Sequence, residues 1–423
     1  MIEKRPRSGY ELLGQRQFQQ LWVANLVSSL SLVMLLLACG WAMASMTTSP
    51  LLVAAVQMAV SVPAFVLGIP LGIMTDRFGH RRLLLVAQIC MLIPECALAL
   101  IVWRGLLTPL LLLSALVVTA IGLVIQGAAW KPLLCAMYPR EEMVAAISLN
   151  SLGNKIGKVV GPAVGGYLTG LAGVALILGL RVLAHIMVIR AVWRLPSSSD
   201  TAFGESDSTA RPRKSFGEGW RFLRRSPQIY GPMVRCALLM APFAGMLALL
   251  PLDAKENIQT DALGYGGLLA ALGFGTVSSM SLMPWLRKHF GMNPTATVAL
   301  AVFAVAMLGV SRWDSMFLDA FFLLVLGFAW SIVSISHQVS VQTATPDDMR
   351  GIMTAFHEVT QQGSVVAGSL IFAFIADRTV VSTSILIAGF VAMAGLLLVR
   401  RYPLSDGTSE DVASENVSED EDR

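Results

Sequence analysis

Residues 51–82 read LLVAAVQMAVSVPAFVLGIPLGIMTDRFGHRR, in which 24 residues without a charge precede a short loop with three arginines. A transmembrane helix needs about 20 mostly apolar residues, so residues 51–74 are long enough to cross a bilayer. The rest of the chain repeats this pattern. Of its 423 residues, 55% are hydrophobic and 14% are charged, and its mean hydropathy is +0.67. A soluble domain carries about 25% charged residues, so the composition predicts a polytopic membrane protein.

Working outward from this stretch, we place twelve transmembrane spans along the chain. They form two sets of six on either side of a polar linker. The predicted fold class is an all-α membrane protein with twelve transmembrane helices in two pseudo-symmetric six-helix bundles. The spans are 21–44, 51–74, 83–103, 106–129, 143–169 and 171–192, then 231–254, 266–285, 296–310, 316–340, 352–375 and 382–399.

The distribution of basic residues predicts the orientation of these spans. If the N-terminus is cytoplasmic, the inner segments hold 23 of the 31 Lys and Arg, and the outer loops hold only Arg104, Lys255, Arg312 and Arg378. This asymmetry follows the positive-inside rule, so both termini are expected in the cytoplasm. The first apolar run is too long for a cleavable signal peptide and lacks a small-residue cleavage site, so we expect it to be retained.

The polar linker predicts the domain organisation. Residues 196–215 are Ser-rich and non-periodic, which is typical of a flexible linker. Phe216, Trp220 and Leu223 then recur at helical spacing beside arginines, which predicts a short amphipathic helix on the inner membrane surface. The predicted parts are a cytoplasmic segment 1–20, an N-terminal bundle 21–194, a linker with this helix 195–230, a C-terminal bundle 231–400 and a disordered acidic tail 401–423. At an offset near 207, residues 138–147 match 345–356, which indicates an internal repeat.

The loop after residues 51–74 carries a spaced set of glycines and charges. Gly72 allows close helix packing, and Asp76 at a helix end can hold a neighbouring helix by charge and dipole. The set resembles the G-x-L-A-D-R-x-G-R-K signature of the major facilitator superfamily, with departures at Met74 and His80. The resemblance implies a gate on the cytoplasmic side. Its matching residues are Gly72, Asp76, Arg77, Gly79 and Arg81.

The span 143–169 carries glycines at every fourth position, so they share one helical face and let a neighbouring helix pack closely. Simple glycine packing is one interpretation. The other is a resemblance to the G-x-x-x-G-P-x-x-G-G motif of proton-coupled antiporters in the same superfamily, which Pro162 supports. The residues of this motif are Gly153, Gly157, Gly161, Pro162, Gly165 and Gly166.

Longer runs narrow the resemblance to one exporter branch of the superfamily. The sequences REEMVAAISLNS (140–151), KVVGPAVGG (158–166) and YGGLLAALGFG (265–275) are similar to the branch that includes enterobactin exporters and macrolide efflux proteins. The similarity extends over roughly residues 18–399. It implies outward transport by alternating access, and it does not specify the cargo.

Ionisable residues inside a bilayer cost at least about 2.5–3.5 kcal/mol each, so they usually serve function. Glu95 and Glu358 are the deepest acids and are the candidates for carrying a coupling proton. The other candidates are mostly cationic, which favours an anionic cargo, although ion pairs between helices would explain them as well. A lone His185 is expected to be a packed, hydrogen-bonded residue. The predicted substrate-binding residues are Asn25, Lys155, Lys158, Arg181, Arg235, His337 and His357.

Several classes of function find no support in the sequence. The run from Gly153 to Val159 is one residue short of a phosphate-binding loop and lacks its Ser/Thr, so nucleotide-driven transport is not expected. No catalytic triad, metal-ligand cluster or nucleic-acid patch stands out, so we expect no cofactor, no metal and no enzymatic activity. The five cysteines are scattered in apolar runs and are interpreted as packing residues.

The sequence therefore predicts a proton-coupled antiporter in a bacterial inner membrane that exports a small anionic metabolite, such as a carboxylate-type siderophore. Its expected partners are this substrate, protons and membrane lipids. A broad-specificity drug or macrolide efflux transporter is the alternative, although cationic drugs would favour more buried acids than this chain has. A receptor or scaffold without transport is a third hypothesis, which the gate loop and the glycine face disfavour.

Overall fold

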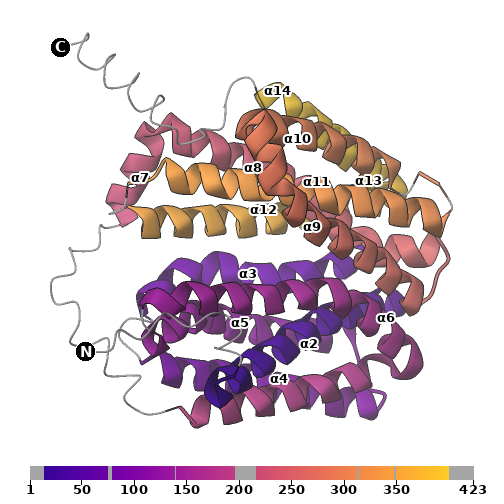
Figure 1. The fold of residues 1–423 in the computed structure, drawn as a ribbon. Helices are drawn as coiled ribbons and strands as arrows, with labels where there is room; N and C mark the ends of the chain where they lie inside the picture. The colour runs from indigo at the N-terminus through magenta and orange to yellow at the C-terminus, as the bar shows by residue number, and fades with distance from the viewer. Residues whose placement is uncertain are drawn as a thin grey trace, which may run out of the picture. The chain divides into compact units, whose positions relative to one another are not determined.

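The computed structural model describes residues 14–74, 79–138, 140–195, 216–310, 312–313, 315–346 and 349–399. Throughout these ranges every regular element is a helix (Figure 1), which confirms the all-α fold class. The helices are α2 (Arg16–Met46), α3 (Pro50–Met74), α4 (His80–Trp103), α5 (Pro109–Met137), α6 (Arg140–Trp193), α7 (Phe216–Arg225), α8 (Pro227–Glu256), α9 (Ala262–Phe290), α10 (Met292–Gly309), α11 (Met316–Thr343), α12 (Arg350–Arg378), α13 (Val381–Ala394) and α14 (Leu396–Val399).

Ten of the described helices are long and apolar enough to cross a membrane. One of them, α6, has 54 residues. A straight helix of that length would measure about 81 Å, whereas the hydrocarbon core is about 30 Å thick. The backbone of α6 leaves the helical region at Ala172 and Gly173, and Gly173 has a φ of 65° that glycine adopts without strain. α6 therefore supplies two spans, α13 with α14 supplies the last, and the helices correspond in order to the twelve predicted spans.

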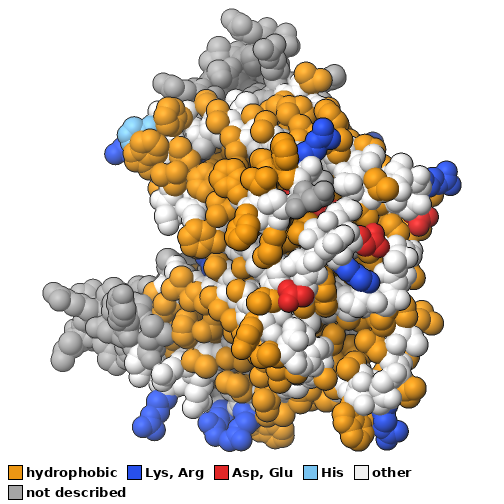
Figure 2. Space-filling view, turned by 90° about the vertical axis from the view of Figure 1, so that its right-hand side faces the viewer, with side chains coloured by type: hydrophobic (Ala, Val, Ile, Leu, Met, Phe, Trp, Pro, Cys, Tyr) orange, Lys and Arg blue, Asp and Glu red, His pale blue; other side chains and the backbone are white. Residues whose placement is uncertain are grey.

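The surface of these helices is largely apolar. Figure 2 shows hydrophobic side chains over most of one face, with Lys and Arg at only a few places. Trp103, Leu110 and Phe317 are 76%, 76% and 88% exposed. A soluble monomer rarely exposes contiguous apolar area on this scale, whereas a bilayer covers it. The chain is thus a multi-pass membrane protein.

The helices form two compact units. The first contains the described residues of Met1–Ala210 together with Ala248–Ala270, and the second contains those of Arg211–Leu247 and Ala271–Arg423. In the first unit α2 packs along α6, and α4 packs against α5 and α6. In the second unit α10 packs against α11 and α13, and α12 packs against α13. α8 and α9 therefore each contribute to both units.

The end of α8 and the start of α9 form a hairpin (residues 248–270) that packs in the first unit. Lys255 Nζ donates to the carbonyl oxygen of Ala44 on α2 at 2.6 Å. The rings of Trp41 and Tyr265 stack with centroids 5.9 Å apart. These contacts tie the hairpin to the C-terminal end of α2.

Within the second unit, the short helix α7 packs on the start of α12. Leu223 of α7 is buried in a cluster that includes Met353 and Phe356 of α12. Gly219 lies so close to Ile352 that an added Cβ would be 2.6 Å from the Ile352 Cδ1 atom. The amphipathic helix thus forms where the sequence predicts it, and its apolar face is covered by α12.

Candidate functional site

A buried ion pair joins α4 to α6 in the first unit. Arg181 Nη2 lies 2.8 Å from Glu95 Oε1, and Arg181 Nε donates to Glu95 Oε2 at 3.1 Å. Both side chains are only 1% exposed. Arg181 Nη1 also donates to the carbonyl oxygen of Ser28 on α2 at 3.2 Å. Bidentate geometry is the form in which a buried guanidinium and carboxylate stabilise each other best.

His185 extends this ion pair, one helical turn after Arg181. His185 Nε2 lies 3.0 Å from Glu95 Oε2, and His185 Nδ1 lies 2.7 Å from Gln88 Oε1. Gln88 Nε2 donates to Gln126 Oε1 on α5 at 3.0 Å. The four buried residues Glu95, Arg181, His185 and Gln88 are called the ion-pair network below.

The ion-pair network can hold a proton. His185 Nδ1 faces the amide oxygen of Gln88, and His185 Nε2 faces a carboxylate oxygen of Glu95. In an imidazolium both ring nitrogens carry hydrogen, so each donates to its partner. A neutral ring has one N–H and one acceptor nitrogen, so it donates in only one of the two contacts. The contact between His185 and Glu95 is therefore a place where one proton can bind.

The glycine motif of α6 faces α2. A Cβ added to Gly157 would lie 3.2 Å from the Leu30 backbone nitrogen, and one added to Gly165 would lie 3.0 Å from Met34 Cα. Gly153 and Gly161 also contact α2, so the four-residue spacing serves one close helix crossing. Gly166 lies on another face of α6 and meets the hairpin.

The contact between Gly166 and Gly266 of α9 is closer still. A Cβ on Gly166 would be 2.7 Å from Gly266 Cα and 2.8 Å from the carbonyl oxygen of Ala262. A Cβ on Gly266 would be 2.7 Å from the carbonyl oxygen of Pro162. Because backbone lies on both sides of this contact, a side chain on either residue would displace the hairpin.

The side chain of Asn25 forms hydrogen bonds with α6 inside the first unit. Its Nδ2 atom donates to Asn150 Oδ1 on α6 at 2.8 Å and to Asn154 Oδ1 at 3.3 Å. Trp130 of α5 donates to the same Asn150 oxygen at 3.0 Å. The amide of Asn25 is therefore used to hold α2, α5 and α6 together, and its role toward a substrate stays a prediction.

The two lysines of α6 differ from Arg181 in their surroundings. Lys155 is half-buried and Lys158 is exposed. Neither amine forms an ion pair within the part of the chain that the structure describes. Because no described acid pairs with either amine, the role of Lys155 and Lys158 in binding an anion stays a prediction.

A second buried polar group lies in the other unit. His337 of α11 and His357 of α12 are 1% and 5% exposed, and Arg235 of α8 is 2% exposed. Arg235 and His357 are both near enough to His337 to act on it electrostatically. Gln361 Nε2 lies 3.2 Å from His357 Nε2. These four residues, Arg235, His337, His357 and Gln361, are called the histidine cluster below.

The histidine cluster has unused hydrogen-bonding atoms. Across the described residues, His337 Nε2 and His357 Nδ1 have no hydrogen-bond partner. A buried polar atom without a partner costs about 1–3 kcal/mol, so such atoms in a native protein usually serve a ligand. Glu358, the neighbour of His357, is exposed and accepts a hydrogen bond from Gln362 at 3.1 Å.

A family model described as "transmembrane secretion effector" matches residues 7–422. The chain belongs to this family. It is a transporter of the major facilitator superfamily and not an enzyme. This confirms the resemblance to the major facilitator superfamily and to its exporter branch.

Relatives and solved structures agree with this membership. The chain is 25% identical over 361 residues to "Enterobactin exporter EntS" of Escherichia coli O1:K1 / APEC, covering 78% of this chain and 80% of the relative. It is 24% identical over 416 residues to the protein of the same name from Shigella boydii serotype 4 (strain Sb227), covering 91% and 93%. The crystal structure of the nucleoside transporter NupG matches with a TM-score of 0.68 at 12% identity, covering 92% of this chain and 99% of that one. The structural match shows the shared fold.

The structure describes only some residues of the predicted gate motif. Asp76 and Arg77 lie outside the described residues, Gly72 lies near the end of α3, and Gly79 precedes α4. Arg81 Nη2 donates to the carbonyl oxygen of Trp193 at 2.7 Å, and its Nε donates to that of Val192 at 3.2 Å. A cation at the C-terminal carbonyls of a helix is favourable, so Arg81 holds the start of α4 to the end of α6.

The sequence predicts a packed, hydrogen-bonded His185, which is confirmed, but it does not predict Gln88 as a site residue. One signal was available, because Arg181 and His185 are four residues apart and therefore share a helical face. The acid that they both face, Glu95, lies 86 residues from Arg181 in the sequence. Among the described residues, no group of three or more His, Cys, Asp or Glu is placed to hold a metal ion.

Proposed function

We propose that this chain is a proton-coupled exporter of a small anionic metabolite, such as a carboxylate-type siderophore. It works by alternating access in a bacterial inner membrane, with both termini in the cytoplasm. The relatives named enterobactin exporters support outward transport of a metabolite. The excess of Lys and Arg in alternate loops supports the orientation.

The contact between His185 and Glu95 carries this proposal, because it can hold a proton beside a permanent cation, Arg181. Loss or gain of that proton changes the net charge of a site that also binds α2 through Ser28. Coupling then follows because the two protonation states favour different packing of α2, α4 and α6.

The histidine cluster supports an anionic cargo. It offers two ring nitrogens, His337 Nε2 and His357 Nδ1, that have no hydrogen-bond partner among the described residues. The buried guanidinium of Arg235 adds positive charge beside them. These groups suit a carboxylate or another small anion, since Arg and imidazole both donate to oxygen acceptors. Lys155 and Lys158 of α6 are separate candidates for binding an anion in the first unit.

Transport in inverted membrane vesicles tests the proposal. Vesicles that contain the protein are energised with a pH gradient and supplied with a citrate-based siderophore, and in a parallel series with a macrolide. We expect siderophore accumulation that collapses with a protonophore and that Glu95→Gln abolishes. Glu256→Gln, at an exposed carboxylate at the end of α8, is the matched control.

Three results would contradict parts of this assignment. Full gradient-driven flux in Glu95→Gln would remove the proton role of the ion-pair network. Macrolide transport without siderophore transport would favour the drug-efflux alternative. Absence of flux for every cargo, with correct insertion, would favour a receptor or scaffold.

A further inference from the structure

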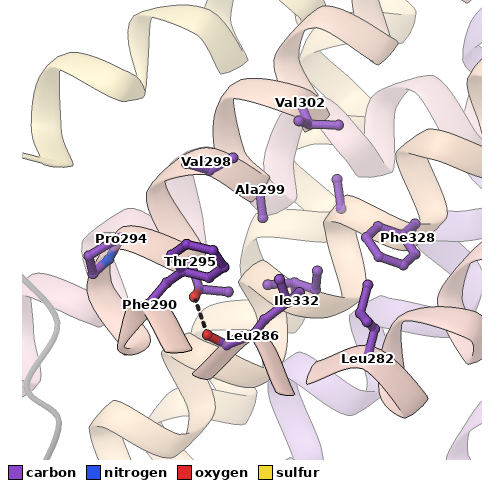
Figure 3. Close-up of a pocket in the computed structure, with 11 residues that line it drawn as sticks. Leu282, Leu286, Phe290, Pro294, Thr295, Val298, Ala299, Val302, Phe328 and Ile332 are labelled. Carbon is purple, nitrogen blue, oxygen red and sulfur yellow. Dashed lines mark hydrogen bonds between the residues drawn. The ribbon is translucent and has the colours of Figure 1, made fainter. Parts of the chain in front are cut away.

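An apolar groove lies on the second unit, between α9, α10 and α11 (Figure 3). Its volume is about 360 Å³, which is within the range of ligand sites of roughly 300–1,000 Å³. Its floor is formed by the small residues Ala299 and Ala329, which are 6% and 1% exposed. Phe290 and Val298 border it and are 59% and 63% exposed. Exposed apolar side chains on a membrane-spanning helix face lipid, so the groove opens to the bilayer.

The lining of the groove offers no hydrogen bond to an occupant. Among its eleven residues, Thr295 is the one with a hydroxyl group. Its Oγ1 donates to the carbonyl oxygen of Gly291 at 2.6 Å and approaches that of Leu286 at 3.4 Å, the second of which Figure 3 shows. A polar ligand would lose its hydration here without compensation. The occupant of the groove is therefore a hydrocarbon.

The length of the groove matches one leaflet. Its lining on α10 extends from Pro294 to Val302, and eight residues of helix rise about 12 Å. One leaflet of a hydrocarbon core about 30 Å thick is about 15 Å deep. A single acyl chain that enters from the membrane surface would fill this groove along most of its depth.

One end of the groove meets permanent positive charge. Arg287 and Lys288 lie in the last turn of α9, between the lining residues Leu286 and Phe290. Neither of them pairs with a carboxylate within the described ranges, and Lys288 is exposed. Trp285, one turn before His289, is 51% exposed with its ring 4.6 Å from the His289 ring. Tryptophan beside basic residues is typical of the layer where lipid headgroups lie.

We propose that this groove binds an anionic phospholipid. One acyl chain lies between α9, α10 and α11, and the headgroup phosphate is bound by Arg287 and Lys288. The site differs from the histidine cluster in its chemistry, because its charges lie at one end of the groove and none line it. A zwitterionic lipid fits the groove equally well but gains less from the two cations, so the site selects for negative charge.

Native mass spectrometry of the full-length protein in detergent tests the selectivity. Phosphatidylglycerol and phosphatidylethanolamine with the same acyl chains are added in equal amounts. We expect phosphatidylglycerol to bind preferentially and Arg287→Ala/Lys288→Ala to weaken its binding by roughly ten- to thirty-fold. Arg224→Ala/Arg225→Ala on α7 is the control for the loss of two positive charges. Equal binding of the two lipids by the unmodified protein, or unchanged preference in Arg287→Ala/Lys288→Ala, would overturn the headgroup assignment.

A photoreactive lipid tests the groove itself. Phosphatidylglycerol with a diazirine in one acyl chain is expected to label peptides from residues 282–302 and 328–332, which contain the lining of the groove. Ala299→Phe places a ring in the groove and should reduce this labelling at least five-fold, whereas Ala394→Phe on the exposed side of α13 should not. Thermal unfolding without added lipid verifies that both variants fold. Labelling elsewhere, or unchanged labelling of a folded Ala299→Phe variant, would overturn the proposal.

Discussion

The two buried polar regions of this transporter differ in how completely their hydrogen bonds are used. In the ion-pair network, the guanidinium, the carboxylate and both ring nitrogens of His185 meet partners within 3.3 Å. In the histidine cluster, His337 Nε2 and His357 Nδ1 have none among the described residues. Both regions are sealed from solvent, so burial alone does not distinguish them.

This difference separates two tasks that charged groups perform inside a membrane. A saturated site has no capacity for a ligand larger than a proton, and removing one member leaves a buried charge behind. An unsaturated site already carries the cost of its unused atoms, and a ligand that bonds to them recovers that cost. Protons are therefore expected to act at the ion-pair network and cargo at the histidine cluster.

The largest expected effect is at Arg181. Arg181→Met leaves the Glu95 carboxylate buried without its guanidinium, and we expect the free energy of unfolding to fall by about 3–5 kcal/mol. The measurement is a denaturant titration in detergent micelles. Arg190→Met, at an exposed position of α6, is the control. Glu95→Gln/Arg181→Met removes both charges and should recover most of the loss, so an equally unstable double variant would contradict the pairing.

The histidine cluster should respond in the opposite way. His337→Leu removes a buried ring whose Nε2 is unsatisfied, so the free energy of unfolding should change by less than about 1 kcal/mol. Calorimetric binding of citrate should weaken roughly thirty-fold, which corresponds to about 2 kcal/mol. His289→Leu, at an exposed position, should leave citrate binding unchanged. A large loss of stability with normal citrate affinity would show that the cluster is structural.

Substitution of Gly166 tests whether its contact with Gly266 and Ala262 holds the hairpin to α6. Gly166→Ala forces a methyl group against Gly266 and Ala262, at a cost of about 1–3 kcal/mol. Residues 248–270 should then exchange amide hydrogens faster, and transport should fall. Gly170→Ala, one turn later, has nothing within 4 Å of its added Cβ and is the matched control. Normal exchange in the hairpin of Gly166→Ala would show that this contact does not hold it.

The smallest effect is expected at Arg81, which bonds two carbonyl oxygens from a half-buried position. Arg81→Ala should lower the free energy of unfolding by about 1 kcal/mol, because water can replace its bonds. Arg82→Ala, which is exposed, should have almost no effect. If Arg81→Ala were as costly as Arg181→Met, burial would not explain the importance of the ion-pair network.

The sequence alone determined the number, order and approximate limits of the membrane spans. The bilayer makes this possible, because its thickness fixes the length of each apolar run and its core excludes unpaired backbone groups. The predicted span 143–169 and the next one, 171–192, meet within three residues of Gly173, where α6 breaks. The glycine spacing of α6 likewise predicted a close helix contact, since spacing by four is a local property of one helix.

Only the tertiary structure decided which polar groups meet. Arg181 and Lys158 are both cations within predicted spans, yet one is enclosed with Glu95 and the other is exposed. They differ because one helical face turns toward other helices and the other does not. Apolar periodicity does not specify which face turns inward, because lipid and protein interior are equally apolar. For the same reason, the sequence predicts a packed, hydrogen-bonded His185, which is confirmed, but does not predict Glu95 as its partner. Nor does the sequence predict that Gly166 faces the hairpin instead of α2. A sequence states which side chains can bind a proton, whereas helix packing decides which of them share one.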